Sequence, residues 1–140
     1  MSESVVSGKH AVHYERGSGI IYLVHFGTIE AEDAHIIRKA IDDICDLAPP
    51  GEPGFLLVDT TNAGGISNDA RKVFTSSRLM ERETYIAHFG ASFGARIFIN
   101  LMMKALSFSS YKMHVNLVAS EAEARAWLLE KKQGLRDRRA

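Results

Sequence analysis

Hydrophobic and polar positions at the start of the chain alternate as they do in β-strands. Two such runs cover residues 10–15 and 20–26. Residues 16–19 between them, Arg-Gly-Ser-Gly, have the glycines and the length of a hairpin connection. The first two strands are therefore expected to be antiparallel.

The period then changes to that of a helix. From about Glu30, apolar residues recur every three or four positions as far as Ile44, and acidic residues occupy the first turn, where the helix dipole favours negative charge. Residues 49–54, Pro-Pro-Gly-Glu-Pro-Gly, are expected to end this helix and form a stiff loop.

Three strand-then-helix units follow. The unbroken apolar run at residues 55–58 is typical of a central strand that is covered on both faces. Ser67 is expected to cap a second helix, after a turn made by the polar residues and the glycine pair that precede it. Residues 85–90 form the next strand, and a strongly apolar third helix follows over residues 97–106.

The last unit closes the predicted fold. Residues 113–118 alternate as a final strand, and Ser120 with Glu123 forms a capping box at the start of a fourth helix. Trp127 is expected to dock that helix on the sheet, and Gly134 is expected to end it.

The order of elements, β-β-α-β-α-β-α-β-α, predicts the α/β class. It indicates a mixed, mostly parallel sheet with an initial antiparallel hairpin and four helices. With 140 residues, of which 46% are hydrophobic, the chain has material for one core, so residues 1–140 are expected to form a single domain. Its ends, about residues 1–9 and 133–140, are expected to be flexible.

Composition narrows the classes of function. Seventeen basic residues balance seventeen acidic ones, which gives no general attraction to nucleic acid or to an anionic membrane. The start of the chain has no secretory pattern, and no apolar run approaches the ~20 residues of a transmembrane segment, so a cytoplasmic location is expected. The single cysteine, Cys45, lies in the first helical pattern and is expected to be a small core residue.

Catalytic and cofactor motifs are not recognisable. Gly90 and Gly94 lack the spacing of a dinucleotide turn and the lysine of a phosphate loop, and there is no Gly-x-Ser-x-Gly segment. No histidine pair has metal-ligand spacing on a helix, although His13 and His25 could face each other across the hairpin. We expect no metal, no cofactor and no enzymatic activity. The histidines are His10, His13, His25, His35, His88 and His114.

Ligands and partners of open parallel sheets tend to lie beyond the carboxyl ends of the strands. That rule nominates a surface made of Asp59, Thr60, Asn62, Ser67, Asn68, Ser92 and Arg96. The same residues have structural explanations, as turn residues and helix caps, and Arg96 either pairs with Asp59 or is solvated.

The chain resembles the SpoIIAA-like branch of the STAS domain families, which are sometimes grouped with Sec14-like domains. The resemblance covers about residues 11–132, and three segments carry it: residues 121–128, Glu-Ala-Glu-Ala-Arg-Ala-Trp-Leu; the strand 55–59 followed by a helix; and the turn 90–92 that leads into the helix of Arg96. It implies a module that is regulated by contact with partner proteins. It also implies a switch, through phosphorylation of a serine at the start of the helix after the central strand.

The switch position departs from the family pattern. Ser67 stands where the family has Asp, and Asn68 stands where it has the phosphorylated Ser. Ser67 becomes the acceptor if the loop pairs one residue out of register, since a helix N-terminus favours phosphate. The alternative is that Ser67 is only an N-cap.

Two functions follow as hypotheses. The first is a non-enzymatic regulatory module that binds a protein partner through the loops after the parallel strands. The second is a carrier or sensor of a small apolar or amphipathic ligand, which the Sec14-like grouping implies, although core packing explains the same apolar third helix. A homodimer contact through Phe108 and Tyr111 is a further expectation. The apolar residues considered for the ligand are Phe93, Phe98, Leu101, Met102 and Met103.

Overall fold

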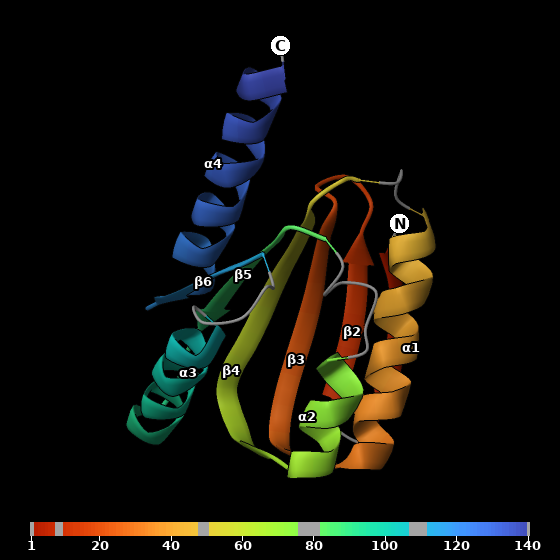
Figure 1. Ribbon diagram of the computed structural model, residues 1–140, viewed down its shortest axis with the longest axis vertical. Helices are drawn as coiled ribbons and strands as arrows, with labels where there is room; N and C mark the ends of the chain where they lie inside the picture. Colours follow the sequence, from red (N-terminus) through yellow and green to blue (C-terminus); the bar gives the residue numbers. More distant parts are fainter. Residues whose placement is uncertain (1, 8–9, 48–50, 76–81, 107–111, 140) are drawn as a thin grey trace.

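One six-stranded sheet organises the protein. The computed structural model describes residues 2–7, 10–47, 51–75, 82–106 and 112–139. Each strand lies beside its neighbours in sequence, in the order β1-β2-β3-β4-β5-β6 (Figure 1). The strands are β1 (Ser2–Ser7), β2 (His10–Glu15), β3 (Ile20–Ile29), β4 (Gly54–Ile66), β5 (Thr84–Phe89) and β6 (Met113–Val118). The helices are α1 (Ala31–Leu47), α2 (Asn68–Thr75), α3 (Phe93–Leu106) and α4 (Glu121–Arg139).

The kind of strand pairing changes once along the sheet, at β3. β1, β2 and β3 pair antiparallel, and β3 to β6 pair parallel. The hairpin between β2 and β3 is closed by Gly19, whose backbone N–H donates to the Glu15 carbonyl at 2.7 Å and whose positive φ suits glycine. The predicted α/β class, with its mostly parallel sheet and four helices, is confirmed.

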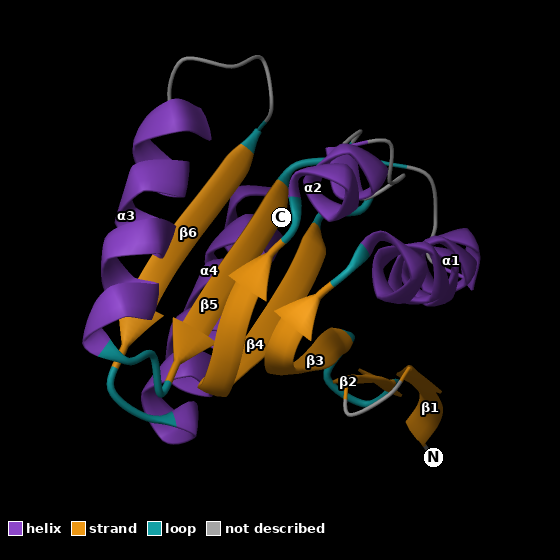
Figure 2. Ribbon diagram, turned by 90° about the horizontal axis from the view of Figure 1, so that it is seen from below, coloured by secondary structure: helices purple, strands orange, loops and turns teal. Residues whose placement is uncertain are grey.

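Helices cover the two faces of the sheet unequally. α1 and α2 lie together on one face, here called the α1 face, and α4 lies on the opposite one, the α4 face (Figure 2). Side chains alternate between the two hydrophobic cores: Leu56 and Val58 of β4 join the α1 face, and Phe55 and Leu57 join the α4 face. These β4 residues are all at least 93% buried, so the predicted central strand is confirmed.

β4 extends further than the sequence pattern indicates. The segment from Asp59 to Gly65 was expected to be a turn, but β4 stays paired with β3 as far as Ile66, through two register shifts. The glycines permit this pairing. A Cβ added at Gly64 would lie 2.8 Å from the carbonyl carbon of Gly27 on β3. Glycine at this position therefore allows β4 to lie close to β3, and it does not form a turn.

β1 was not predicted. Residues 2–7 were placed in a flexible end, but they form an antiparallel strand on β2, with Val5 beside Val12. β1 pairs with the edge of β2 through backbone groups. The sequence pattern does not predict this strand, because Ser2, Ser4 and Ser7 are short polar residues.

α4 also passes the glycine that was expected to end it. Gly134 lies inside the helix, and Leu135 beyond it packs against the core of the α4 face. A glycine inside a helix costs only about 1 kcal/mol relative to alanine, which such packing offsets. Ala124 and Leu128 are fully buried and Trp127 is half-buried, so the docking of this helix through its apolar residues is confirmed.

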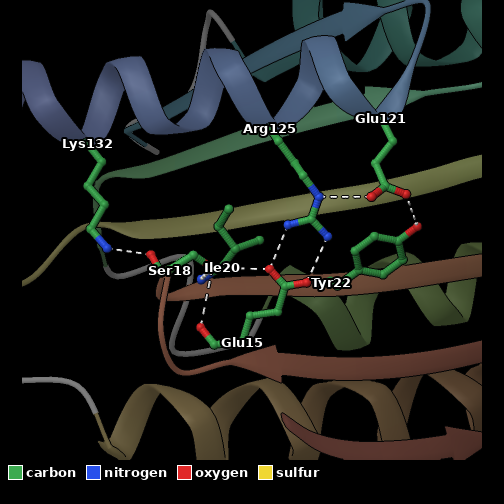
Figure 3. Close-up of polar contacts among 7 residues, drawn as sticks. All are labelled: Glu15, Ser18, Ile20, Tyr22, Glu121, Arg125 and Lys132. Carbon is green, nitrogen blue, oxygen red and sulfur yellow. Dashed lines mark hydrogen bonds and ion pairs between the residues drawn. The ribbon is translucent and has the colours of Figure 1, made fainter. Parts of the chain in front are cut away.

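Polar contacts tie α4 to the β2–β3 hairpin (Figure 3). The Arg125 guanidinium donates two hydrogen bonds of 2.7 Å to the Glu15 carboxylate and one of 2.9 Å to Glu121. The Tyr22 hydroxyl donates to Glu121 at 3.1 Å, and burial together with this carboxylate raises the pKa of Tyr22 to about 12. About two turns further along α4, the Lys132 ammonium donates to the Ser18 carbonyl.

Candidate functional site

A cavity of about 330 Å³ opens on the α1 face, where β3, β4 and β5 meet the first turns of α3. We call it the α3 cavity. Most of its wall is apolar or glycine backbone, and two histidines and a threonine provide the polar side chains. Its described lining residues are His25, Thr60, Ala63, Gly64, Gly65, Ile66, His88, Gly94, Ala95 and Ile99.

Histidines from three strands gather beneath α1 and α3. His10 on β2 lies beside His25 on β3, with ring centroids 5.8 Å apart, and His25 and His88 on β5 line the cavity together. His13 and His25, which could have faced each other across the hairpin, do not do so, because the register places His13 opposite Tyr22. His10 takes this place instead, one position beyond the Ala11–Val24 pair in the same register.

Both ring nitrogens of His10 have hydrogen-bond partners within the fold. Its Nδ1 accepts the backbone N–H of Phe26 at 3.2 Å, so its Nε2 carries the hydrogen and faces the Thr28 carbonyl at 3.3 Å. The Asp33 carboxylate at the start of α1 lies 3.8 Å from the same Nε2. His10 therefore joins β2 to the end of β3 and to the first turn of α1.

His25 and His88 are not satisfied in this way. His25 Nε2 and His88 Nδ1 are buried and have no hydrogen-bond partner among the described residues. Burial lowers the pKa of His88 to about 4, with a smaller effect from His25. Burial and the neighbouring His10 lower the pKa of His25, whereas backbone groups of Gly27 and Gly65 act in the opposite direction. Both rings are thus neutral near pH 7, and each has a buried nitrogen that no described group satisfies.

The surface nominated from the sequence is divided by the structure. Thr60 is buried, lines the α3 cavity and donates its hydroxyl to the Phe89 carbonyl at 2.7 Å. Asp59 points to the other face, where its Oδ1 accepts the backbone N–H of Thr61 at 3.0 Å. Asn62 is exposed on β4 and is not among the described lining residues.

The remaining nominated residues lie at the starts of two helices. Ser67 accepts the backbone N–H of Ala70 at 3.1 Å, which makes it the N-cap of α2, and Asn68 is exposed in the first turn. Ser92 caps α3 in the same way, by accepting the N–H of Ala95 at 3.3 Å. Arg96 is exposed, and its Nε donates to the Ala91 carbonyl at 3.3 Å. Of the nominated residues, the described lining of the cavity includes Thr60.

The cavity histidines were missed because they were read as scattered residues. A signal was present in the alternation of the strands. His25 continues the inward series of Ile21 and Leu23, and His88 stands two positions after the inward Ile86. A histidine in the buried phase of a strand needs a partner, and two such histidines in parallel strands indicate a shared site.

α3 carries an exposed apolar stripe on its outer side. Phe93, Ile97 and Leu101 are 81%, 48% and 61% exposed and recur every four residues, whereas Ile99 is buried against the cavity. Phe93 and Leu101 therefore lie on the surface rather than around a ligand. The side chains of Phe98, Met102 and Met103, which were considered for the ligand, lie outside the described part of the structure. Phe108 and Tyr111, which were considered for a homodimer contact, lie outside the described residues as well.

Within the described residues, no cluster of three His, Cys, Asp or Glu side chains has the arrangement of a metal site. Among the helices of the described ranges, none combines the length and the apolar character that crossing a bilayer requires. Cys45 lies on α1 and is buried in the core of the α1 face, as expected.

The fold can now be compared with known proteins. No family model and no curated protein matches the chain. Among solved structures, it is similar to the crystal structure of an uncharacterised protein of the DUF3478 family from Shewanella loihica PV-4, which has a SpoIIAA-like fold. The TM-score is 0.60, with 14% sequence identity over 91% of this chain and 92% of that chain. At this identity the likeness concerns the fold, and the chain has a SpoIIAA-like, STAS-type fold.

Proposed function

We propose that this protein is a non-enzymatic regulatory module that binds a small, largely apolar ligand in the α3 cavity. The observation that carries the proposal is a cavity of about 330 Å³, mostly apolar, two of whose lining histidines each have a buried ring nitrogen without a partner among the described residues. Pockets of roughly this size, with a few convergent polar groups, are typical of small-molecule sites. A buried polar atom without a partner costs about 1–3 kcal/mol, which a bound hydrogen-bonding group recovers.

The polar groups of the cavity favour binding over catalysis. The Thr60 hydroxyl donates to a backbone carbonyl, and no described hydroxyl or thiol is hydrogen-bonded to His25 or His88. A nucleophile is normally activated by a base within hydrogen-bond reach. The described lining is suited to holding a molecule, and a cytoplasmic sensor or carrier is consistent with this role.

Calorimetric titration with octan-1-ol tests the proposal. Ala95 lines the cavity, and Ala95→Leu fills part of it, so this variant is expected to lose octanol binding. Ala122→Leu on the exposed surface of α4 is the matched control and is expected to bind as the wild type does. Equal binding by both variants would show that the probe occupies another place.

Contact with a protein partner is a second candidate function, favoured by the exposed stripe of Phe93, Ile97 and Leu101. Contiguous exposed apolar residues mark interaction surfaces in water-soluble domains. The exposed Lys104 on the same helix allows cross-linking in a lysate of the source organism. A partner that is cross-linked to the wild type and not to an Ile97→Ser/Leu101→Ser variant supports this function, and identical products from both proteins contradict it.

A further inference from the structure

The chemistry of the two cavity histidines restricts the ligand beyond its apolar character. They stand on β3 and β5, with β4 between them, so their strands lie about 9–10 Å apart at the usual strand spacing. The unpartnered atoms are His25 Nε2 and His88 Nδ1, and both rings line the same cavity. A head group with two polar atoms suits two nitrogens that approach from different strands better than a single hydroxyl does.

We infer that the α3 cavity binds a small monocarboxylate with an apolar tail, that His25 and His88 hold its carboxyl group, and that one proton is taken up on binding. This inference rests on the proposed function and adds the ligand class. The apolar remainder of the wall, including Ala95 and Ile99, would surround the tail.

The proton follows from the charges around the site. The described lining contains no lysine or arginine. A bare carboxylate would therefore enter an apolar cavity without a compensating charge, which is strongly unfavourable. The bound pair is instead neutral overall: the carboxylate and one neutral imidazole take a proton from the buffer and form a hydrogen-bonded pair, and no other bond changes.

The charged groups around the cavity are not placed to bind the carboxylate or to take up the proton in place of His25 and His88. His10 is the titratable neighbour of His25 from β2, and Asp33 of α1 lies against His10 rather than in the cavity lining. From α3, Arg96 is exposed and directed to the Ala91 carbonyl. The charged residues of α2 are exposed; they are Asp69, Arg71 and Lys72.

His25 is the residue that would keep the proton. Backbone groups of Gly27 and Gly65 favour its charged form, whereas desolvation holds the pKa of the His88 ring at about 4. His88 would then complete the site as a neutral hydrogen-bonding partner of the carboxyl group.

Titration calorimetry with octanoate and octan-1-ol tests the inference in the wild-type protein. Repeating the octanoate titration in buffers of different ionisation enthalpy counts the protons taken up. One proton is expected, and the affinity for octanoate should fall about tenfold per pH unit between about pH 6.5 and 8, because both the carboxylate and the free histidines are then unprotonated. Octanol binding should not change over the same range.

Variants locate the effect. His25→Gln and His88→Gln should each weaken octanoate binding at least about tenfold and change octanol binding little, since a lost hydrogen bond to a charged group is worth about 1.5–3 kcal/mol. His114→Gln is the matched control, because His114 is exposed on the α4 face.

The outcomes separate the two proposals. If neither probe binds, the proposed function and the inference both fail. If both probes bind equally, without proton uptake, the inference fails and the proposed function stands. If proton uptake survives in both histidine variants, the assignment of the carboxyl group to His25 and His88 is overturned. The proton count in the wild type decides the ligand class even if a variant does not fold.

Discussion

The two faces of the sheet differ in how completely they are filled. On the α4 face, aromatic rings of β4, β5 and β6 stack in a row, with Phe55 and His114 on either side of Tyr85 at centroid distances of 5.6 and 4.6 Å. On the α1 face, the region beyond Val58 holds the α3 cavity, where one ring nitrogen of His25 and one of His88 have no partner among the described residues. The comparison indicates that packing on the α4 face stabilises the fold. On the α1 face, the cavity and the unsatisfied nitrogens reduce the free energy of unfolding and form a candidate binding site.

The polar groups of the faces show the same contrast. Arg125 on the α4 face makes hydrogen bonds to both Glu15 and Glu121, so each charge has a partner. On the α1 face, one ring nitrogen of His25 and one of His88 have no partner among the described residues. Buried polar groups are normally satisfied, and exceptions in a native structure are associated with function.

The largest effect is expected from the filled face. Leu128→Ala removes a fully buried side chain of α4 and should lower the free energy of unfolding by about 2–5 kcal/mol. Leu129→Ala is the control, because Leu129 is 48% exposed, and it should change stability by less than about 0.5 kcal/mol. Urea denaturation measures both, and equal losses would contradict the docking of α4 through Leu128.

Loss of stability at low pH is expected mainly from the α1 face, through His88. The pKa of His88 is about 4 in the folded protein and near 6.5 when unfolded, so the unfolded chain binds the extra proton between these values. Stability is therefore retained above pH 6.5 and lost as the pH falls toward 4, by an amount on the order of 3 kcal/mol. His88→Leu should remove this part of the pH dependence. A parallel pH profile for wild type and variant would show that His88 is protonated in the fold.

A smaller effect is expected from the hairpin clamp. Glu15→Gln, Arg125→Met and the double variant form a cycle whose coupling free energy should be about 1–2 kcal/mol at pH 7, the range of a partly exposed, bidentate ion pair. The Arg125 guanidinium holds the pKa of Glu15 below its usual value. The coupling is thus present above the unfolded pKa and lost as the pH falls through the folded one. A coupling of zero at pH 7 would mean that the Arg125–Glu15 pair does not contribute to holding α4 on the hairpin.

The smallest effect concerns the outer side of α3. Ile97→Ser should change the free energy of unfolding by no more than about 0.5 kcal/mol, because Ile97 is 48% exposed. Ile99→Ser, two residues along the same helix, places a hydroxyl where the side chain is 5% exposed and should be much more destabilising. Similar thermal midpoints for the two variants would contradict the orientation of this helix.

The parts of the fold that were predicted correctly have signals within a single segment. Each of these elements is predicted by its own residues, whatever it packs against. The patterns are the apolar run before Asp59, the helical period after Glu30 and the capping box at Ser120. In the structure the Glu123 backbone N–H donates to Ser120 Oγ at 3.2 Å, so the cap works as the local sequence indicates.

The parts that were missed depend on what a segment meets. β1 and the far half of β4 are held by backbone pairing with β2 and β3, which glycines such as Gly64 permit and side-chain patterns do not reveal. The α3 cavity is assembled from three strands and a helix, so His25 and His88 come together only when the register is known. Thr60 was nominated because strand ends are recognisable from the sequence alone.

The reach of α4 back to the first hairpin has a consequence for biosynthesis. Arg125 and Glu15 are separated by 110 positions, whereas every strand pairs with its neighbour in sequence. The sheet can therefore assemble strand by strand as the chain leaves the ribosome, but Ile20 and Leu57 stay uncovered until the last helix arrives. Exposed apolar surface during folding promotes aggregation, so a nascent chain stalled before α4 would be a substrate for chaperones, and release of the final helix would convert the assembled sheet into a cooperative unit.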